Sequence, residues 1–194
     1  MLNYFDTTLE ILKHSLHSID YTAMSELVNA CEQAERSGHN VIVSGLGKNV
    51  PICEKFVGTM LSLGLNASFL HTNTAIHGDL GMVKSGDVVI LLSKSGSTIE
   101  SVYLAEQLVS RNVHLWDITF NPNGRLSKLI DHQLVIGLEH EGDQWDIMPN
   151  NSTILNLIVL QTIAMQLSIR MGITLEQFKM NHPGGAIGER LRNG

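Results

Sequence analysis

Cysteine is scarce in this sequence: Cys31 and Cys53 are the only two among 194 residues. Two separated cysteines make neither a disulfide framework nor the ligand spacing of a structural metal site. His77, His182 and nearby acids could hold a divalent ion only adventitiously. We therefore expect a reduced, cytoplasmic protein with no metal site.

Positive charge is also scarce. Lysine and arginine number 13 against 19 aspartates and glutamates, which gives a net charge of −6. Nucleic-acid phosphates require clustered basic residues, so this balance argues against a nucleic-acid partner. One local basic pocket for a small phosphate ester remains compatible with it.

Long uninterrupted apolar runs are missing. The N-terminal segment MLNYFDTTLEILKHSL carries Asp6 and Glu10 within its apolar pattern and is typical of an amphipathic helix rather than a signal peptide. The longest apolar stretch, 154–169, is too short and too polar for a membrane span, because it is interrupted by Asn156, Gln161, Thr162 and Gln166. We expect no membrane partner.

Helical and strand patterns alternate along the chain. Helical periodicity covers 5–36 in two pieces, with a break at 18–20. Almost continuous apolar runs then predict five strands, at 40–47, 67–71, 86–93, 112–119 and 132–139. Helices are predicted between and after them, at 51–63, 98–111, 124–130, 151–171 and 174–180. Strands of this kind, separated by helices, predict an α/β fold with a parallel sheet covered on both faces.

The sequence contains no linker or repeat that would divide it. We expect a single domain over 1–194, with N-terminal helices forming a hairpin (1–38), an α/β core (39–172) and a C-terminal tail (173–194). Ligands of such sheets bind at the carboxyl ends of the strands, at a topological switch point. The polar loops that follow the strands are therefore the candidate site.

The loop after the third strand, LLSKSGSTIE, is rich in hydroxyl groups. Gly96 lets the backbone approach a ligand closely, and a helix begins near Ser97 with free N–H groups. Together they predict an anion cradle. The alternative is a plain serine-rich helix cap with Glu100 as a solvated first-turn carboxylate.

Lys48 lies in the loop GLGKNVP (45–51) after the first strand. This loop matches neither the dinucleotide fingerprint nor the P-loop. The lysine is placed to stabilise an oxyanion or a phosphate, or else it is an ordinary surface lysine.

Three further loops carry groups that can transfer protons. His77 lies in NTAIHGDLGM (73–82), Glu141 in the acidic loop 139–153, and His182 in NHPGGAIG (181–188). A lone histidine or an acidic loop usually has no catalytic role. The coincidence of five polar loops at one predicted sheet edge favours a shared site.

These motifs together resemble the sugar isomerase (SIS) domain family, and within it the arabinose 5-phosphate isomerases. The similar segments are GLGK, AIHGDLGMV, LLSKSGSTIE, PNNST and NHPGGAIGERL, which run in family order from residue 41 to 191. The resemblance implies a flavodoxin-like SIS fold. It implies interconversion of D-arabinose 5-phosphate and D-ribulose 5-phosphate, feeding synthesis of 3-deoxy-D-manno-octulosonate (Kdo) for lipopolysaccharide or capsule.

The resemblance also implies roles for individual residues. The catalytic group would comprise Lys48, His77, Glu100, Glu141 and His182. The phosphate would bind to Ser93, Ser95, Gly96, Ser97 and Thr98, and other substrate contacts would come from Gly47, Asn49, Thr74 and Gly78. Isomerisation through a cis-enediol needs a base, a carrier of hydroxyl protons and positive charge, but no cofactor. We assign the C–H proton to His182 or Glu141, the O1 and O2 protons to His77, and sugar orientation or ring opening to Glu100.

The chain departs from the family pattern in several places. Asn49 and Val50 replace the usual serine and glycine after the lysine and are followed by Pro51, and Lys94 stands where asparagine is common. The loop around Glu141 is more acidic and lacks the usual cysteine. Many relatives continue into a pair of CBS domains. This sequence reaches Gly194 three residues after the last motif, so we expect an SIS-only form.

Assembly and alternative functions follow from the same resemblance. The N-terminal helices and the apolar helix near 154–169 predict a homo-oligomer, and the family suggests a tetramer. A nucleotide sugar such as CMP-Kdo is a candidate inhibitor. The alternative interpretations are another SIS sugar-phosphate isomerase and a non-catalytic sugar-phosphate-binding regulator.

Overall fold

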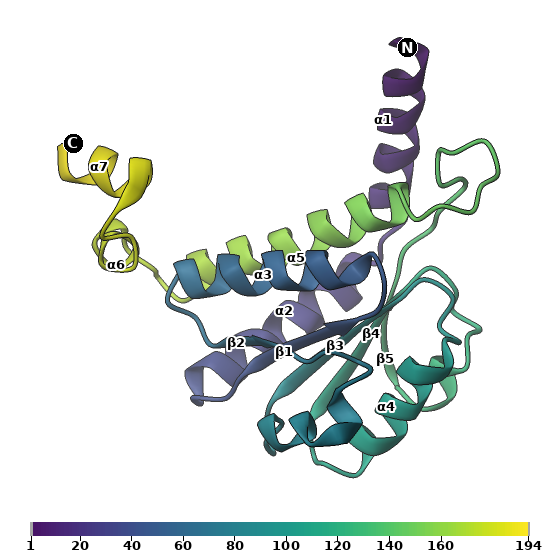
Figure 1. The fold of residues 1–194 in the computed structure, drawn as a ribbon, viewed down its shortest axis with the longest axis horizontal. Coiled ribbons are helices and arrows are strands. Elements are labelled where there is room, and N and C mark those ends of the chain that lie inside the picture. The colour runs from purple at the N-terminus through teal and green to yellow at the C-terminus, as the bar shows by residue number, and fades with distance from the viewer. Residues whose placement is uncertain (1, 194) are drawn as a thin grey trace.

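Five parallel strands form the centre of the molecule. The computed structural model describes residues 2–193. Its sheet has the order β2-β1-β3-β4-β5, as Figure 1 shows. The strands are β1 (Val41–Gly45), β2 (Ala67–Phe69), β3 (Val88–Ser93), β4 (His114–Thr119) and β5 (His132–Val135). The predicted α/β class and parallel sheet are confirmed.

The central strands are buried on both faces. Every residue of β1 and β3 is buried, and the two strands pair in register from Val41 opposite Val88 to Gly45 opposite Leu92. Such strands must be apolar throughout, which is why their sequences lack the alternation of a half-exposed sheet. β5 ends at Val135, four residues earlier than the predicted end at 139, because the chain turns away from the edge of the sheet.

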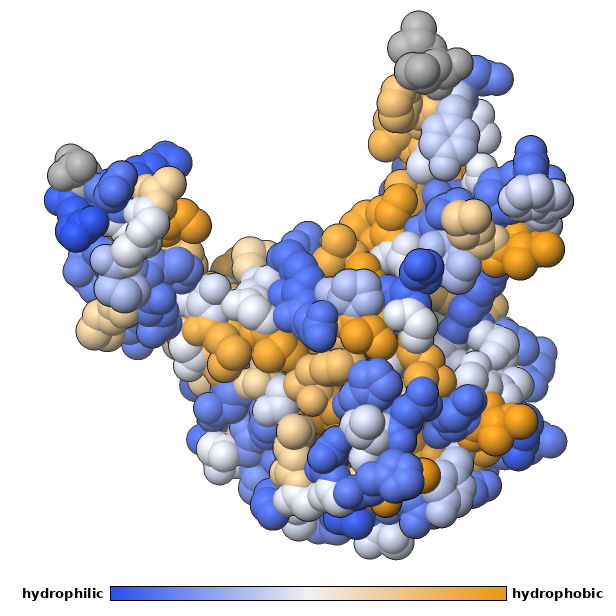
Figure 2. Space-filling model, in the orientation of Figure 1, coloured by the Kyte–Doolittle hydropathy of each residue, from blue (hydrophilic) through white to orange (hydrophobic). Residues whose placement is uncertain are grey.

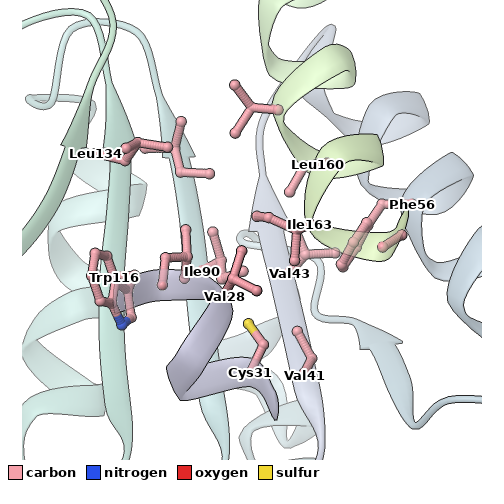
Figure 3. Packing of buried hydrophobic residues seen from close by; sticks show 14 of the residues in the cluster. Val28, Cys31, Val41, Val43, Phe56, Ile90, Trp116, Leu134, Leu160 and Ile163 are labelled. Carbon is pink, nitrogen blue, oxygen red and sulfur yellow. The ribbon is translucent and has the colours of Figure 1, made fainter. Parts of the chain in front are cut away.

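Three helices cover one face of the sheet. They are α2 (Tyr21–Arg36), α3 (Asn49–Ser62) and α5 (Asn151–Arg170). Figure 3 shows their side chains meeting alternate residues of the strands, such as Val41 and Val43 of β1 and Ile90 of β3. α3 begins two residues before Pro51, which the first turn of a helix tolerates because its N–H groups have no helical partner.

The opposite face is covered by α4 (Ile99–Val109) and three short 3₁₀ turns. These turns are η1 (Ala75–His77), η2 (Asp79–Met82) and η3 (Leu126–Lys128). Their buried side chains join the alternate strand residues Ile42, Val89 and Leu91 in a second apolar cluster. Helices on both faces follow from strands that are apolar on both sides.

The two predicted N-terminal helices are present. α1 (Leu2–His17) and α2 both pack against α5, and α1 projects from the body in Figure 1. α5 is long and apolar enough to cross a membrane by length and composition. One face of it nevertheless lies in the core, where Leu160, Ile163 and Leu167 are fully buried.

The C-terminal segment forms an arm of two helices, α6 (Leu175–Met180) and α7 (Gly185–Asn193). Figure 1 shows this arm projecting at the opposite end of the molecule from α1. The sequence predicted α6 as the last helix, and that prediction was wrong. The run PGGAIG hides the start of α7, because glycine is a weak helix former and is read as a turn.

Candidate active site

A cavity of about 890 Å³ opens at the carboxyl ends of β1 and β3. From β1 the chain passes to β2 on one side of β1, whereas β3, β4 and β5 follow on the other side. The strand order therefore reverses between β1 and β3, and this position is the topological switch point. The lining side chains come from the loops after β1, β3, β4 and β5 and from the first two turns of α5. The fold therefore gathers polar loops from distant parts of the sequence around one crevice.

The serine-rich loop 93–98 is braced from behind by the segment 119–126. Gly96 has φ +60°, and its carbonyl accepts the N–H of Leu126 at 2.8 Å. A Cβ on Gly124 would lie 2.7 Å from backbone atoms of Gly96. The two glycines thus allow a backbone contact that fixes the shape of the loop.

Several polar groups of this loop remain available to a ligand. Ser93 lines the cavity and is buried, and its hydroxyl has no hydrogen-bond partner. Thr98 is the N-cap of α4, yet its side chain makes no capping hydrogen bond. A buried hydroxyl without a partner is costly unless something binds it. The loop has the composition and free donors of an anion cradle.

Lys48 and its neighbours form the opposite wall. Gly47, with φ +57°, turns the chain after β1, and Lys48 is the exposed N-cap residue of α3. Asn49 accepts a hydrogen bond from the Asn156 side chain at 3.0 Å and so joins α3 to α5. Asn49 therefore links two walls of the cavity.

Glu141 is fully buried beside the cavity and acts as a cap for α5. It accepts the N–H groups of Asn150 and Ser152 at 3.0 and 2.9 Å and the Ser152 hydroxyl at 2.6 Å. The Lys94 ammonium lies 2.7 Å from Oε1, the oxygen that also accepts the Ser152 hydroxyl. Burial raises the pKa of Glu141, but Lys94 and the three hydrogen bonds outweigh it and hold the pKa below the ordinary value. Glu141 is a stable carboxylate with both oxygens occupied.

The predicted site residues divide into three groups. Those that line the cavity are Gly47, Lys48, Asn49, Ser93, Ser95 and Thr98. Gly96 and Ser97 lie in the same loop, where the Ser97 hydroxyl accepts the N–H of Arg125 at 3.0 Å. The remaining predicted residues are not among the described residues that line the cavity: Thr74, His77, Gly78, Glu100, Glu141 and His182.

Two of the predicted catalytic groups lie on the outer surface. His77 is exposed in η1, and Glu100 is exposed in the first turn of α4. His182 lies in the C-terminal arm, where its ring stacks on Phe178 with centroids 4.0 Å apart. The arm is held by Asn181, which donates to the carbonyl of Ser62 at the last turn of α3. Because α3 begins at the cavity, His182 lies at the far end of that helix.

The cavity also contains residues that the sequence reasoning did not assign. They include Lys94, Asn121, His140, Asp146, Ser152 and Asn156. Asn121 follows β4 as closely as the serine loop follows β3, so the same positional rule would have found it. Ser152 and Asn156 are four residues apart on one face of α5. His140 is adjacent to Glu141 in an acidic loop, where the sequence alone gives no distinguishing signal.

Comparison with known proteins identifies the family. The family model described as "SIS domain" matches residues 36–171, and the chain belongs to this family. It is 33% identical over 184 residues to an arabinose 5-phosphate isomerase, KdsD, of Pseudomonas aeruginosa. That match covers 95% of this chain and 56% of the relative. The chain thus spans a little over half the length of the curated relatives it matches.

Solved structures agree with the fold. The E. coli CFT073 protein c3406, solved in complex with arabinose 5-phosphate, has a TM-score of 0.85 and 29% identity, with 93% of this chain and 94% of that chain covered. A Bacteroides fragilis protein assigned as a phosphosugar isomerase of capsule formation has a TM-score of 0.86 and 28% identity, covering 95% and 98%. The five-stranded sheet and its flanking helices are those of sugar isomerase domains.

Proposed function

We propose that this chain is an arabinose 5-phosphate isomerase that interconverts D-arabinose 5-phosphate and D-ribulose 5-phosphate. The observation that carries the proposal is the braced serine loop, with the unpartnered Ser93 hydroxyl, facing Lys48 across a cavity at the switch point. The KdsD relatives and the neighbour bound to arabinose 5-phosphate supply the substrate. No cofactor enters the mechanism.

In this mechanism the phosphate anchors the substrate. Hydroxyls of Ser93, Ser95 and Thr98 and the positive end of α4 hold the phosphate dianion. The binding energy then fixes the sugar so that C1 and C2 meet the proton-transferring groups. Lys48 stabilises the negative charge that develops on the enediolate.

Of the two candidates for the C–H base, His182 and Glu141, the geometry favours His182. Both carboxylate oxygens of Glu141 already accept hydrogen bonds. α3 has 14 residues, or about 20 Å of helix, between the cavity and the arm that carries His182. We therefore propose that His182 serves the cavity of a second copy of the chain.

A homotetramer is the assembly we propose. Figure 2 shows apolar side chains along the hollow between α1 and the C-terminal arm. Large apolar side chains that are more than 60% exposed include Leu9, Trp145, Ile147, Ile169 and Met180. Such surface is typical of an interface, and we propose that a second copy covers it and presents the His182 of its own arm.

The physiological setting is part of the same proposal. We place the chain in the cytoplasm, at the step that supplies arabinose 5-phosphate for Kdo, and we expect CMP-Kdo to be a feedback inhibitor. The two free cysteines are buried, and burial raises the pKa of Cys53 to about 12, so its thiol stays protonated. Unreactive buried thiols suit a reducing compartment.

The test is a coupled assay of the purified chain with D-arabinose 5-phosphate, alongside ribose, glucose and sedoheptulose phosphates. Turnover confined to arabinose 5-phosphate supports the proposal. Turnover of another sugar phosphate instead would assign a different SIS isomerase. Binding of a sugar phosphate without turnover, detected as a rise in melting temperature, would assign a regulator.

A further inference from the structure

The cavity of a single chain contains few groups that can carry a proton at neutral pH. Its ionisable lining residues are Lys48, Lys94, Glu139, His140 and Asp146. Only histidine has an ordinary pKa near neutrality. Within residues 2–193, His140 is the one histidine that lines the cavity, and neither the sequence motifs nor the comparisons assign it a role.

The hydrogen bonds of His140 fix which ring nitrogen bears the proton. Its Nδ1 accepts the N–H of Gly142 at 2.9 Å. Nδ1 therefore carries a lone pair, and the neutral ring carries its proton on Nε2. The side chain is 46% exposed, and Nε2 lies 4.0 Å from Oδ1 of Asp146, which also lines the cavity. The ring thus offers one N–H donor at the cavity wall.

The loop that carries His140 is held in place by its own carboxylates. Asp143 accepts the N–H groups of Trp145, Ile147 and Met148 at 2.9–3.1 Å. Asp146 has φ +55° and accepts the N–H of Glu141 at 2.6 Å. Glu141 in turn joins the loop to α5. A preorganised loop keeps the imidazole position fixed, which a catalytic donor requires.

We propose that His140 is a catalytic residue of this chain, whose Nε2 exchanges protons with O1 and O2 of the pentose phosphate. The proposal rests on the isomerase function above and deepens it. When the base removes the C2 proton, the C1=O1 electrons move to O1, which takes the proton from Nε2. Nε2 then accepts the proton of O2–H, and the protonated base returns its proton to C1 as C2=O2 forms. The imidazole ends as it began.

This proposal replaces the assignment of the O1 and O2 protons to His77. His77 is exposed and lies outside the cavity of its own chain. The two assignments differ in an observable way. His140 belongs to the chain that builds the cavity, whereas His77 can act only where another copy presents it.

The experiment compares His140→Asn, His140→Gln and His77→Asn with wild type. Asparagine at 140 places an acceptor near Nδ1 for the Gly142 N–H and removes Nε2. His71→Asn is the matched control, because His71 Nδ1 likewise accepts the N–H of the residue two positions on, Asn73 at 3.3 Å, outside the cavity. Each variant is assayed in D₂O for conversion and for deuterium at C2 of the recovered arabinose 5-phosphate.

The expected result for His140→Asn is a loss of about 10²–10⁴-fold in kcat, with little change in KM. The ratio of deuterium incorporation at C2 of recovered substrate to product formation should rise above the wild-type ratio. The reason is that abstraction of the C2 proton continues while proton transfer between O1 and O2 slows. A merely structural role would leave that ratio unchanged. His140→Gln should retain a donor but not restore the rate, and His71→Asn should match wild type.

The outcomes separate the two proposals. If wild type isomerises arabinose 5-phosphate and His140→Asn keeps its rate and exchange ratio, the His140 assignment is overturned while the isomerase stands. If only His77→Asn shows the altered ratio, the protons belong to His77. If wild type turns over no sugar phosphate, both proposals are overturned.

Discussion

The Lys94 ammonium lies 2.7 Å from Oε1 of Glu141, whose side chain has no exposed surface. Lys94 belongs to the phosphate loop after β3, and Glu141 caps α5. The pair therefore joins the loop that would hold the phosphate to the helix that forms the far wall. The sequence resemblance predicted asparagine at position 94, and it is the lysine there that makes this ion pair.

Glu141→Gln should destabilise the fold. An amide cannot accept all of the hydrogen bonds that the carboxylate accepts, and its NH₂ group would face Lys94 or a backbone N–H. We expect a loss of about 1–3 kcal/mol in the free energy of unfolding, measured by urea denaturation. Glu176→Gln is the control, because Glu176 is 79% exposed and its ion pair with Lys179 should contribute less than about 1 kcal/mol.

The same pair predicts a dependence on pH. The folded pKa of Glu141 lies below its ordinary value of 4.5. Its stabilising contribution is therefore fully present above that value and is lost as pH falls through the lower folded pKa. The stability difference between wild type and Glu141→Gln should shrink on acidification below about pH 4. A difference that stays constant with pH would contradict an ionised Glu141.

Asp117→Asn should have the opposite pH signature. Asp117 is fully buried in β4, one of its oxygens has no partner, and burial raises its pKa to about 7. The folded state holds this proton more tightly than the unfolded state, so wild-type stability falls as pH rises from about 4 to 7. Asparagine removes the ionisation, and the variant should gain relative stability as pH rises.

Melting temperatures of wild type and Asp117→Asn at about pH 5 and about pH 8 provide the measurement, since these values lie on either side of the folded pKa of Asp117, about 7. Glu35, whose pKa burial likewise raises to about 7, would contribute the same slope independently. Glu35→Gln should therefore remove a second part of the slope, and the double variant should remove both. Parallel curves for wild type and Asp117→Asn would show that Asp117 does not titrate in this range.

Gly124→Ala should weaken binding of the phosphate. Its Cβ would lie 2.7 Å from the backbone of Gly96, so the serine loop must shift. We expect KM for the sugar phosphate to rise by at least about tenfold, since the misplaced loop loses roughly one charge-assisted hydrogen bond or more. The measurement is KM together with inhibition by inorganic phosphate.

Gly58→Ala is the control for that substitution. Gly58 lies exposed in α3, and a Cβ there meets nothing within 4 Å. Alanine at this helix position should raise stability by up to about 1 kcal/mol and leave KM unchanged. Equal KM values for Gly124→Ala and wild type would exclude the proposed bracing of the loop.

Sharing of sites between copies predicts complementation. Lys48→Ala and His182→Ala should each be nearly inactive, because Lys48 lines the chain's own cavity and His182 lies at the far end of α3. Unfolding the two variants together and refolding them should give mixed oligomers in which about a quarter of the sites contain both wild-type residues. Mixing without a gain in activity would place both residues in one chain's site.

The fold was predictable because its signals are local. Continuous apolar runs such as VIVSG and VVILLS, alternating with helical patterns, are typical of buried parallel strands, and the loops after such strands lie at one sheet edge. Lys48 and Ser93 followed from that rule. The exposure of His77 and the distance of His182 could not be predicted, because they depend on where η1 and the C-terminal arm lie in space.

His140 was not predicted for a similar reason, because its role depends on the three-dimensional arrangement of its loop. Position relative to a strand predicts that a loop reaches the site, but not which of its side chains faces the cavity. Within 139–150 that choice depends on Asp143 and Asp146, whose backbone contacts fold the loop. Those contacts leave no periodic pattern in the sequence.

α5 has a geometric consequence for the evolution of this chain. Ser152 and Asn156 near its start line the cavity, and it ends at Arg170, just before the C-terminal arm. Its 20 residues therefore set a distance of about 30 Å between the cavity and the arm. Adding or removing a helical turn would change the spacing between the cavity that a chain builds and the histidine that it presents elsewhere. Insertions and deletions in α5 should therefore be tolerated less well than those in surface loops, although most residues of α5 lie away from the cavity.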